Sequence, residues 1–398
     1  MPLATIPEAV EAFQAGHFVM IVDDEDRENE GDLAVAAAKV TPQHISFMAH
    51  RAGGLICTPV ISSRLEELGI EPMVGNNTSR LGTAFTVSVE ARDLVTTGIS
   101  AHDRVATIHH LLNPDARPAD FAKPGHTFPL QAVEGGVLQR AGHTEAAVDL
   151  ARLAGLYPAG VICEVMDEDG TMARLPALEV MAAEADIPLV TIKDLIAYRR
   201  RHEKLVRHRG SKAVQIADRT WTVHAYEDLT SGTVDVALVL GDISPDRPTL
   251  VRVHSCCLTG DVYGSARCDC GAQLQAAIDA IASEGRGLLV YLTDHEGRGI
   301  GLFEKLRAYR LQDEGLDTVQ ANEALDQPAD SRDYGIGMQI IADLGVRDLR
   351  LMTNNPRKLI GLDGFGLTVA EQVPIRIPPN EHNERYLQTK KEKLGHLL

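Results

Sequence analysis

Hydrophobic and polar positions alternate in short blocks along the 398-residue chain, and the period of the pattern changes repeatedly. Residues 4–16 have the period of an amphipathic helix, and Thr41-Pro42 is typical of the start of a second helix over 42–51. Short apolar runs at 18–22 and 33–38 predict buried strands. Strands and helices are therefore interleaved, which predicts a mixed α/β (α+β) fold.

The same mixture continues through the chain without an internal repeat. The further predicted strands are 55–60, 161–165, 221–226, 234–240, 250–253, 288–292 and 349–352, and the further predicted helices include 273–283 and one that ends at Leu344. A basic, helix-like run from Lys193 to Gly210 ends the first half, so we place a domain boundary close to Arg201. We expect two consecutive domains, 1–201 and 202–398, each with its own sheet and active site.

Length and charge narrow the classes of function. The chain is long enough for two ordinary domains, and 44% of its residues are hydrophobic, which is enough to fill two cores. Its formal net charge of −17 repels polyanions, which argues against a nucleic-acid partner but leaves small phosphorylated substrates open. We find no cationic leader and no apolar run of about 20 residues, the length of a membrane span. We therefore expect a cytoplasmic protein without membrane contact.

Four of the six cysteines lie within 15 residues: Cys256, Cys257, Cys268 and Cys270. Clustered thiols in a reducing cytosol are more often zinc ligands than disulfide partners. The last three are spaced C-x10-C-x-C, unlike the paired C-x2-C arms of structural zinc sites. Three thiolates leave one position for water, which is the pattern of a catalytic zinc site.

Spacing alone leaves an alternative open. Adjacent side chains of an extended chain point to opposite faces, so Cys256 is poorly placed to join Cys257 on one ion. A closed structural site completed by His254 or Cys256 is the other interpretation.

A second candidate metal site lies in the first half. The run from Asp23 to Asp32, DDEDRENEGD, contains seven carboxylates in ten residues after a predicted strand. A charge run of this kind is often a solvated turn. Carboxylates packed so densely repel one another, however, and a hard divalent cation such as Mg²⁺ relieves that repulsion by binding their oxygens.

Other polar segments of the first half have the composition of a binding site. Lys123–His126 is expected in a turn before a strand at 127–130. His143 opens an alanine-rich helix, where free N–H groups favour phosphate and the imidazole can bind a metal or move a proton. Glu164 lies in an apolar strand, and a buried carboxylate needs a partner or a raised pKa.

The second half has three comparable segments. A glycine-rich segment at 294–299 follows a strand, a polar segment at 330–335 precedes a helix, and 353–358 follows another strand with Thr, Asn, Arg and Lys. Glycine-rich backbone and basic side chains at such transitions are suited to phosphate.

The motifs, taken in order, resemble those of a known family. The first half contains DDEDRENEGD, NNTS, TTGIS, GGVL, RAGHTEA and DGTMAR, and the second contains CLTGD, RCDCG, EGRGIG, YRLQDEGLDTVQAN, TNNPRK and YLQTKKEKLGHLL. This set resembles the bifunctional riboflavin-biosynthesis family, in which 3,4-dihydroxy-2-butanone 4-phosphate synthase is fused to GTP cyclohydrolase II. The resemblance covers nearly the whole chain.

For the first half, the resemblance implies conversion of D-ribulose 5-phosphate to L-3,4-dihydroxy-2-butanone 4-phosphate and formate, with Mg²⁺ or Mn²⁺. Glu28 and His143 match the metal ligands, and His126 and Glu164 match the catalytic positions. The implied substrate contacts are Arg27, Glu28, Asp32, Arg140, Ala141, Gly142, His143, Thr144 and Glu164.

For the second half, the resemblance implies hydrolysis of GTP to 2,5-diamino-6-ribosylamino-4(3H)-pyrimidinone 5′-phosphate, formate and pyrophosphate, with Mg²⁺ accompanying GTP. Asp330 matches the proton acceptor, Arg332 the nucleophile and Tyr309 a tyrosine needed for deformylation. The implied Zn²⁺ ligands are Cys257, Cys268 and Cys270, and the implied GTP contacts are Arg252, Val253, His254, Ser255, Cys256, Gln273, Glu296, Gly297, Arg298, Thr318, Thr353 and Lys358.

Two positions depart from the family pattern. Cys256 stands where glutamate is usual, and Gln131 stands where arginine is usual. Cys256 can weaken GTP or Mg²⁺ binding or offer zinc a competing thiolate. One alternative is therefore that only the synthase half is active and the second half is a degenerate zinc- and nucleotide-binding domain. Another is a zinc-stabilised nucleotide sensor without turnover. The resemblance also implies a homodimer.

Overall fold

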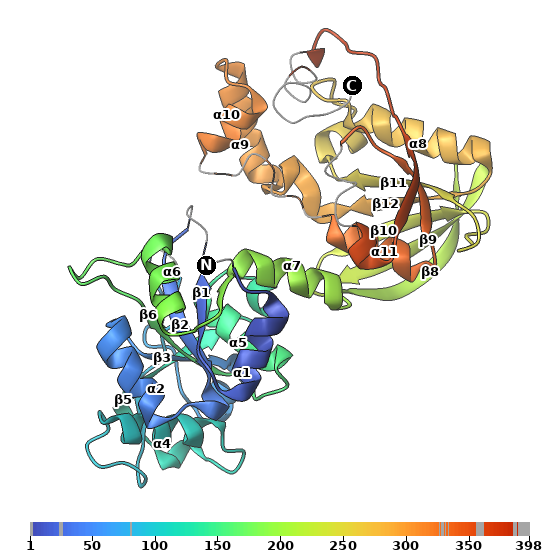
Figure 1. The fold of residues 1–398 in the computed structure, drawn as a ribbon. Coiled ribbons are helices and arrows are strands. Elements are labelled where there is room, and N and C mark those ends of the chain that lie inside the picture. The colour runs from blue at the N-terminus through green and yellow to red at the C-terminus, as the bar shows by residue number, and fades with distance from the viewer. Residues whose placement is uncertain are drawn as a thin grey trace. The chain divides into compact units, whose positions relative to one another are not determined.

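The computed structural model describes residues 3–23, 27–79, 82–325, 327, 330, 332, 334–355, 362–384 and 388. It divides into two compact units, Met1–Arg199 (the N-terminal unit) and Arg200–Leu398 (the C-terminal unit). Each unit has one mixed sheet with helices packed on it (Figure 1). The expected mixed α/β fold with two consecutive domains is confirmed. Within the described residues, no helix is long and apolar enough to cross a membrane.

The N-terminal unit has a seven-stranded sheet in the order β4-β5-β3-β6-β2-β1-β7. Its central strands β1 and β2 are buried at every position, which explains why they are continuous apolar runs in the sequence. The strands are β1 (Val19–Val22), β2 (Gly31–Ala36), β3 (Cys57–Ile61), β4 (Val89–Ala91), β5 (Phe121–Ala132), β6 (Gly160–Glu164) and β7 (Leu189–Thr191).

Helices cover both faces of this sheet. Val19 and Ile21 of β1 pack in one apolar core with helices α1 and α5, whereas Met20 and Val22 pack in another with α2, α4 and α6. Alternate residues of a strand point to opposite faces, so the unit has three layers. The helices are α1 (Ile6–Ala15), α2 (Pro42–Phe47), α3 (Ser62–Glu67), α4 (Ala101–Leu112), α5 (His143–Leu153), α6 (Leu175–Glu184) and α7 (Ile192–His202).

The C-terminal unit has a second seven-stranded sheet, in the order β14-β13-β11-β12-β10-β9-β8. Strands β12, β11, β13 and β14 are parallel, and β8, β9, β10 and β12 pair antiparallel. The strands are β8 (Val206–Ile216), β9 (Arg219–Asp228), β10 (Val234–Leu240), β11 (Thr249–Ser255), β12 (Gly287–Leu292), β13 (Asp348–Met352) and β14 (Thr368–Val373).

Helices α8 (Cys270–Glu284) and α11 (Gly335–Asp343) pack on opposite faces of this sheet, because Ile281 of α8 and Ile341 of α11 belong to different apolar cores. Helices α9 (Gly301–Asp313) and α10 (Thr318–Glu323) follow β12. The parallel strands β11 and β12 end together at Ser255 and Leu292, and polar segments follow both ends. Ligand sites of open α/β sheets commonly lie at such carboxyl ends.

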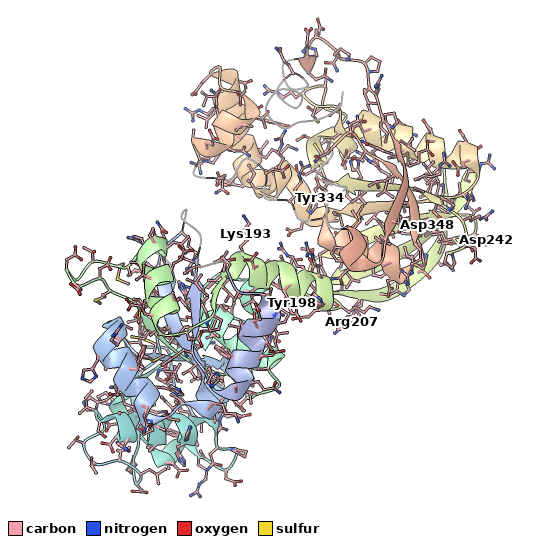
Figure 2. All side chains as sticks on the ribbon, in the orientation of Figure 1. Lys193, Tyr198, Arg207, Asp242, Tyr334 and Asp348 are labelled. Carbon is pink, nitrogen blue, oxygen red and sulfur yellow. The ribbon has the colours of Figure 1, made fainter. Side chains whose placement is uncertain are left out.

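Two predictions about local structure were wrong. Lys123–His126 is not a turn before a strand but part of β5: Val89 of β4 pairs with Thr127 and Glu90 with Ala122, so residues 123–126 bulge out of the ladder. The basic run is not one helix, because α7, which carries Lys193 and Tyr198, ends at His202 and Arg207 lies on β8 (Figure 2). Charge composition does not distinguish an exposed helix from an exposed edge strand.

Candidate active sites

A cavity of about 510 Å³ opens in the N-terminal unit, and we call it the N-terminal cavity. Strands β2, β3, β5 and β6 and the start of α5 all contribute side chains to it. Its lining residues are Arg27, Glu28, Glu30, Asp32, Cys57, Thr83, Phe85, Leu130, Arg140, His143, Thr144, Ile162 and Glu164. A volume of this order suits a small molecule.

Most of the residues predicted for the first site meet in this cavity. Gly142, the N-cap of α5, and Ala141 are not among its lining residues. His126 is not among them either; it lies in the bulge of β5, half-exposed and paired with Glu90. Gln131 follows the lining residue Leu130 on β5 but does not line the cavity.

Asp32 and His143 are buried side chains of the N-terminal cavity, and Glu164 lines the cavity beside Asp32. Asp32 of β2 and Glu164 of β6 are direct partners in the antiparallel ladder. The His143 Nδ1 atom lies 3.8 Å from Asp32 Oδ1 and 3.4 Å from Glu28 Oε2. Burial raises the pKa of Asp32, and the neighbouring charge of Glu164 adds to the rise. Burial opposes protonation of His143, but Asp32 and Glu28 outweigh it and raise the imidazole pKa.

Glu164 is half-buried rather than fully buried. It has a hydrogen-bond partner, as the sequence analysis expected for a carboxylate in an apolar strand. Its Oε2 atom accepts a hydrogen bond from the Leu55 N–H at 2.9 Å. A Cβ atom on Gly54 would lie 2.6 Å from that same oxygen, so glycine is needed for this close approach. The carboxylate is therefore held in place by backbone.

Three side chains of this cavity region offer atoms within 4.8 Å of one another: Asp23, Glu28 and His143. Both Asp23 oxygens already accept backbone N–H groups, from Glu28 at 3.1 Å and from Glu30 at 2.9 Å, so Asp23 shapes the loop. In contrast, the buried atoms His143 Nε2 and Asp32 Oδ1 have no hydrogen-bond partner among the described residues. Carboxylate oxygen is a suitable ligand for Mg²⁺ or Mn²⁺ and imidazole nitrogen is a common metal ligand, so these residues fit a divalent cation.

The C-terminal unit contains a cavity of about 640 Å³, the C-terminal cavity, at the carboxyl ends of β11 and β12. Of the predicted nucleotide contacts, Ser255, Cys256, Gly297, Arg298 and Thr318 line it. Its other lining residues are Cys257, Arg267, Cys268, Cys270, His295, Ile300, Lys305, Ala308, Tyr309, Gln312, Asn322 and Arg332.

The three cysteines with the C-x10-C-x-C spacing meet in this cavity. The sulfur atoms of Cys257, Cys268 and Cys270 lie within 4.8 Å of one another, and the first two are 3.7 Å apart. Four tetrahedral ligands about 2.3 Å from one zinc ion lie about 3.8 Å apart, so the triangle fits zinc. Gly260 leaves the necessary room, because a Cβ atom there would lie 2.9 Å from Cys268 Sγ and 3.1 Å from Cys257 Sγ.

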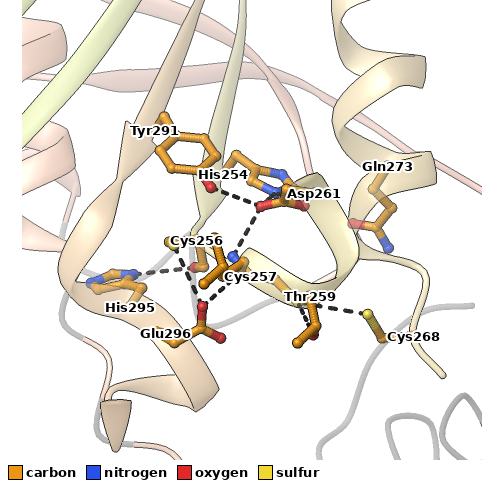
Figure 3. A network of polar contacts seen from close by, with 12 residues as sticks. His254, Cys256, Cys257, Thr259, Asp261, Cys268, Gln273, Tyr291, His295 and Glu296 are labelled. Carbon is orange, nitrogen blue, oxygen red and sulfur yellow. Dashed lines mark hydrogen bonds and ion pairs between the residues drawn. The ribbon is translucent and has the colours of Figure 1, made fainter. Parts of the chain in front are cut away.

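Neither His254 nor Cys256, the two residues considered as a fourth zinc ligand, belongs to this group of three cysteines (Figure 3). The His254 Nε2 atom faces both carboxylate oxygens of Asp261 at 3.1 Å. Asp261 also accepts hydrogen bonds from the Tyr291 hydroxyl and the Cys257 N–H, each at 2.9 Å. The Cys256 thiol donates instead to Glu296 Oε2 at 3.7 Å. The geometry therefore favours an open site with three thiolates.

Glu296 lies at the centre of a second set of contacts. Its carboxylate accepts from the Leu258 N–H at 2.6 Å, from the Gly297 N–H at 3.1 Å and from the Lys305 ammonium at 2.5 Å. Lys305 also donates to Cys257 Sγ at 3.2 Å. No feature of the local sequence marked Lys305, which reaches this site from the middle of α9.

The remaining predicted residues of the second site that the structure describes do not line the cavity. Arg252 is buried and donates to the Met352 carbonyl at 2.9 Å and to Gln273 Oε1 at 2.6 Å. Val253 and Thr353 are buried, and neither lines the cavity. Residues 24–26, Ser331, Asp333, Pro356, Arg357, Lys358 and most of the motif that begins at 386 lie outside the described residues.

Asp330 and Arg332 form an ion pair with an N–O distance of 2.6 Å. Burial raises the Asp330 pKa, but the hydrogen bond and charge of Arg332 outweigh it and lower the pKa overall. Arg332 also reaches Ser255 Oγ at 3.5 Å, and its guanidinium lies over the ring of Tyr334, which packs edge-on against His295. The predicted acceptor and nucleophile are therefore adjacent at the cavity.

Known proteins resemble both units. Family models match residues 7–198 (3,4-dihydroxy-2-butanone 4-phosphate synthase) and 207–374 (GTP cyclohydrolase II). Riboflavin biosynthesis protein RibBA of Aquifex aeolicus (strain VF5) is 56% identical over 396 residues, 99% of this chain and 98% of the relative. RibBA of Bacillus mycoides (strain KBAB4) is 56% identical over 393 residues with the same coverage. The chain belongs to this bifunctional riboflavin-biosynthesis family.

A solved two-domain structure also resembles most of the chain. RibBX of A. baumannii, described as a two domain 3,4-dihydroxy-2-butanone 4-phosphate synthase, is 34% identical with a TM-score of 0.70 and covers 94% of this chain and 100% of its own. As a member of the family, the chain combines a lyase, the synthase, with a hydrolase, the cyclohydrolase. The comparisons give no support to a degenerate C-terminal half.

Proposed function

We propose that the N-terminal cavity is the synthase site and that Glu28 and His143 hold its divalent cation. The supporting observation is the buried Nε2 atom of His143, which has no hydrogen-bond partner among the described residues. A bound Mg²⁺ or Mn²⁺ would polarise the carbonyl and hydroxyl oxygens of D-ribulose 5-phosphate. Glu164, which accepts the Leu55 N–H, would move protons between neighbouring carbons, and Arg140 would supply positive charge for the phosphate.

His126 is the proposed catalytic residue that the N-terminal cavity lacks. Along β5 it lies four residues from the lining residue Leu130, which is about 13 Å of extended strand. Its imidazole is half-exposed beside Glu90. A homodimer in which one subunit presents His126 to the cavity of the other would complete the site, and we propose this assembly.

The C-terminal cavity is the proposed cyclohydrolase site, with zinc held by Cys257, Cys268 and Cys270. The observation that carries this assignment is the triangle of sulfur atoms with one edge of 3.7 Å. A zinc ion there would supply hydroxide near neutral pH for opening the imidazole ring of GTP. Arg298 and Arg332 bring positive charge to the cavity, which suits the Mg²⁺-bound triphosphate, and Asp330 beside Arg332 is the proposed proton acceptor.

A paired formate assay on one preparation tests these assignments. One tube receives D-ribulose 5-phosphate, the other receives GTP, and both contain Mg²⁺ after the zinc content of the protein has been measured. We expect formate from both tubes and pyrophosphate from the GTP tube. Formate from the sugar phosphate alone, with zinc bound, would contradict the assignment of the C-terminal cavity; formate from GTP alone would contradict that of the N-terminal cavity.

A further inference from the structure

Lys305 is buried in the wall of the C-terminal cavity, with 7% of its surface exposed. Its ammonium lies between two side chains from distant segments, 3.2 Å from Cys257 Sγ and 2.5 Å from Glu296 Oε1. It also lies 5.7 Å from the centre of the Tyr309 ring. Each of these groups attracts a cation, so the ammonium sits at the point where their attractions combine.

The orientation of α9 is the reverse of what hydrophobic burial alone would give. Lys305 and Ala308 are the buried residues of this helix, whereas Phe303 and Leu306 are 74% and 52% exposed. Burying an ammonium is costly unless it is paired and hydrogen-bonded, and exposing phenylalanine and leucine forgoes a favourable burial. The contacts of Lys305 therefore favour the observed rotation of α9, in which Lys305 faces Cys257 and Glu296.

Charge gives Lys305 a role at the proposed metal site. Three thiolates and one Zn²⁺ carry a net charge of about −1, which repels a nucleotide triphosphate. An N–H donor on one thiolate draws negative charge away from it. Hydrogen bonds from groups behind the ligands are known to orient metal ligands and to tune the metal.

We propose that Lys305 is a positioning residue for the cyclohydrolase reaction. Its ammonium hydrogen-bonds the Cys257 thiolate and Glu296 together, and so couples the zinc ligand to the carboxylate predicted to contact GTP. This inference rests on the proposed function of the C-terminal cavity. Loss of the ammonium leaves the Glu296 carboxylate buried beside a thiolate with only backbone and thiol donors, and the two anions then repel each other.

Cobalt binding tests the proposal without turnover. Zinc is removed from the full chain and Co²⁺ is added, because the thiolate-to-cobalt absorption band reports both affinity and ligand environment. We expect Lys305→Met to bind Co²⁺ about 10-fold or more weakly, as removal of such outer partners commonly does, with a shifted band. Lys305→Arg keeps the charge and should restore part of the affinity. Arg307→Met is the matched control, since Arg307 is on the same helix, exposed, and pairs with Glu304.

The outcomes are distinguishable. Lys305→Met with the affinity and band of the wild-type chain would overturn the proposal. The fluorescence of Trp221, which is buried in the C-terminal unit, shows whether that unit is folded, and Lys305→Gln, which also lacks the positive charge, replaces Lys305→Met if the latter does not fold. A wild-type chain with the cobalt band but no formate from GTP would overturn the proposed turnover and leave the role of Lys305 standing. A wild-type chain without the band would overturn the zinc site and the role of Lys305 together.

Discussion

The two cavities hold their polar groups with different parts of the fold. In the N-terminal cavity Cys57, Glu164 and Asp32 lie on β3, β6 and β2, which are neighbours in the sheet. At the C-terminal cavity the lining residue Cys257 precedes a short π-helical turn, and Glu296, which does not line the cavity, lies where the segment Thr293–Arg298 departs from helical backbone angles. Strand register fixes the first set, whereas side-chain contacts fix the second.

This difference predicts how each cavity depends on its proposed metal. The Asp32–Glu164 pairing is part of a ladder whose backbone hydrogen bonds hold with or without a ligand. The thiolates of Cys257, Cys268 and Cys270 sit on segments outside the sheet, and like charges at this distance repel one another. The C-terminal cavity should therefore lose its arrangement without zinc, and the N-terminal cavity should keep its own without Mg²⁺.

Removing one sulfur should have the largest effect. Cys268→Ser leaves two thiolates, which cannot form the proposed three-thiolate site, so zinc content should fall and formate release from GTP should drop by about 10³-fold or more. Formate release from D-ribulose 5-phosphate should not change. Zinc content and both formate rates on the same preparation provide the measurement. A variant that keeps its zinc and its GTP turnover would show that the triangle is not the metal site.

Glu28→Gln should lower the synthase activity and leave the cyclohydrolase activity unchanged. It removes a negative charge from the proposed Mg²⁺ or Mn²⁺ ligands with little change of shape, so formate release from D-ribulose 5-phosphate should fall by about 10²-fold or more. GTP turnover should be unchanged, because the residue lies in the other unit. Raising the Mg²⁺ concentration should recover part of the rate. Equal losses of both activities would mean that the two sites are not independent.

The sequence predicted the cysteine cluster better than its surroundings. Cys257, Cys268 and Cys270 are close in the chain, and their spacing predicted the group whose sulfur atoms lie within 4.8 Å of one another. The apolar runs also predicted β1 and β2 correctly, because both strands are buried throughout. The pairing of Asp32 with Glu164 joins segments more than a hundred residues apart and depends on strand order. The order of strands in the sheet cannot be deduced from a local sequence pattern.

The surroundings of two single residues, Lys305 and His126, were also not predictable from the local sequence. Lys305 is a lysine in a polar helical run, and only the packing of α9 shows that it is buried between Cys257 and Glu296. His126 was expected in a turn before a strand, but pairing with β4 continues on both sides of it. In both cases the deciding contact comes from a segment distant in sequence.

The pH dependence of the free energy of unfolding tests whether Asp235 anchors the C-terminal cavity to the sheet. This buried residue of β10 accepts the Thr293 N–H at 2.8 Å and so fixes the start of the segment that carries Glu296. Burial raises the pKa of Asp235 to about 6. Between its unfolded pKa near 4 and about 6 the folded chain binds the proton more tightly, so the free energy of unfolding should fall as pH rises through this window.

The fall attributable to Asp235 should be no more than about 3 kcal/mol, from about two pKa units at 1.36 kcal/mol each. Asp235→Asn can still accept the Thr293 N–H and should lose this part of the pH dependence. Trp221 is the single tryptophan and is buried in the C-terminal unit, so its fluorescence during urea unfolding reports that unit. Identical pH profiles for the two chains would contradict the prediction.

Gly260→Ala should have the smallest effect and bears most directly on the contrast between the two cavities. The added Cβ would lie 2.9 Å from Cys268 Sγ and 3.1 Å from Cys257 Sγ, closer than such atoms normally approach. Because the thiolates are on segments outside the sheet, they can move apart by a few tenths of an ångström, and zinc affinity should fall by about 10-fold rather than vanish. Competition with a chelator measures that affinity.

Gly54→Ala is the matched change in the other unit, where the new Cβ would meet the Glu164 carbonyl oxygen at 2.4 Å. Strand β6 cannot move away in the same manner, so the loss of synthase activity there should be larger than the loss of zinc affinity at Gly260. The reverse order would mean that the loop-borne thiolates are held more rigidly than the strand-borne carboxylates.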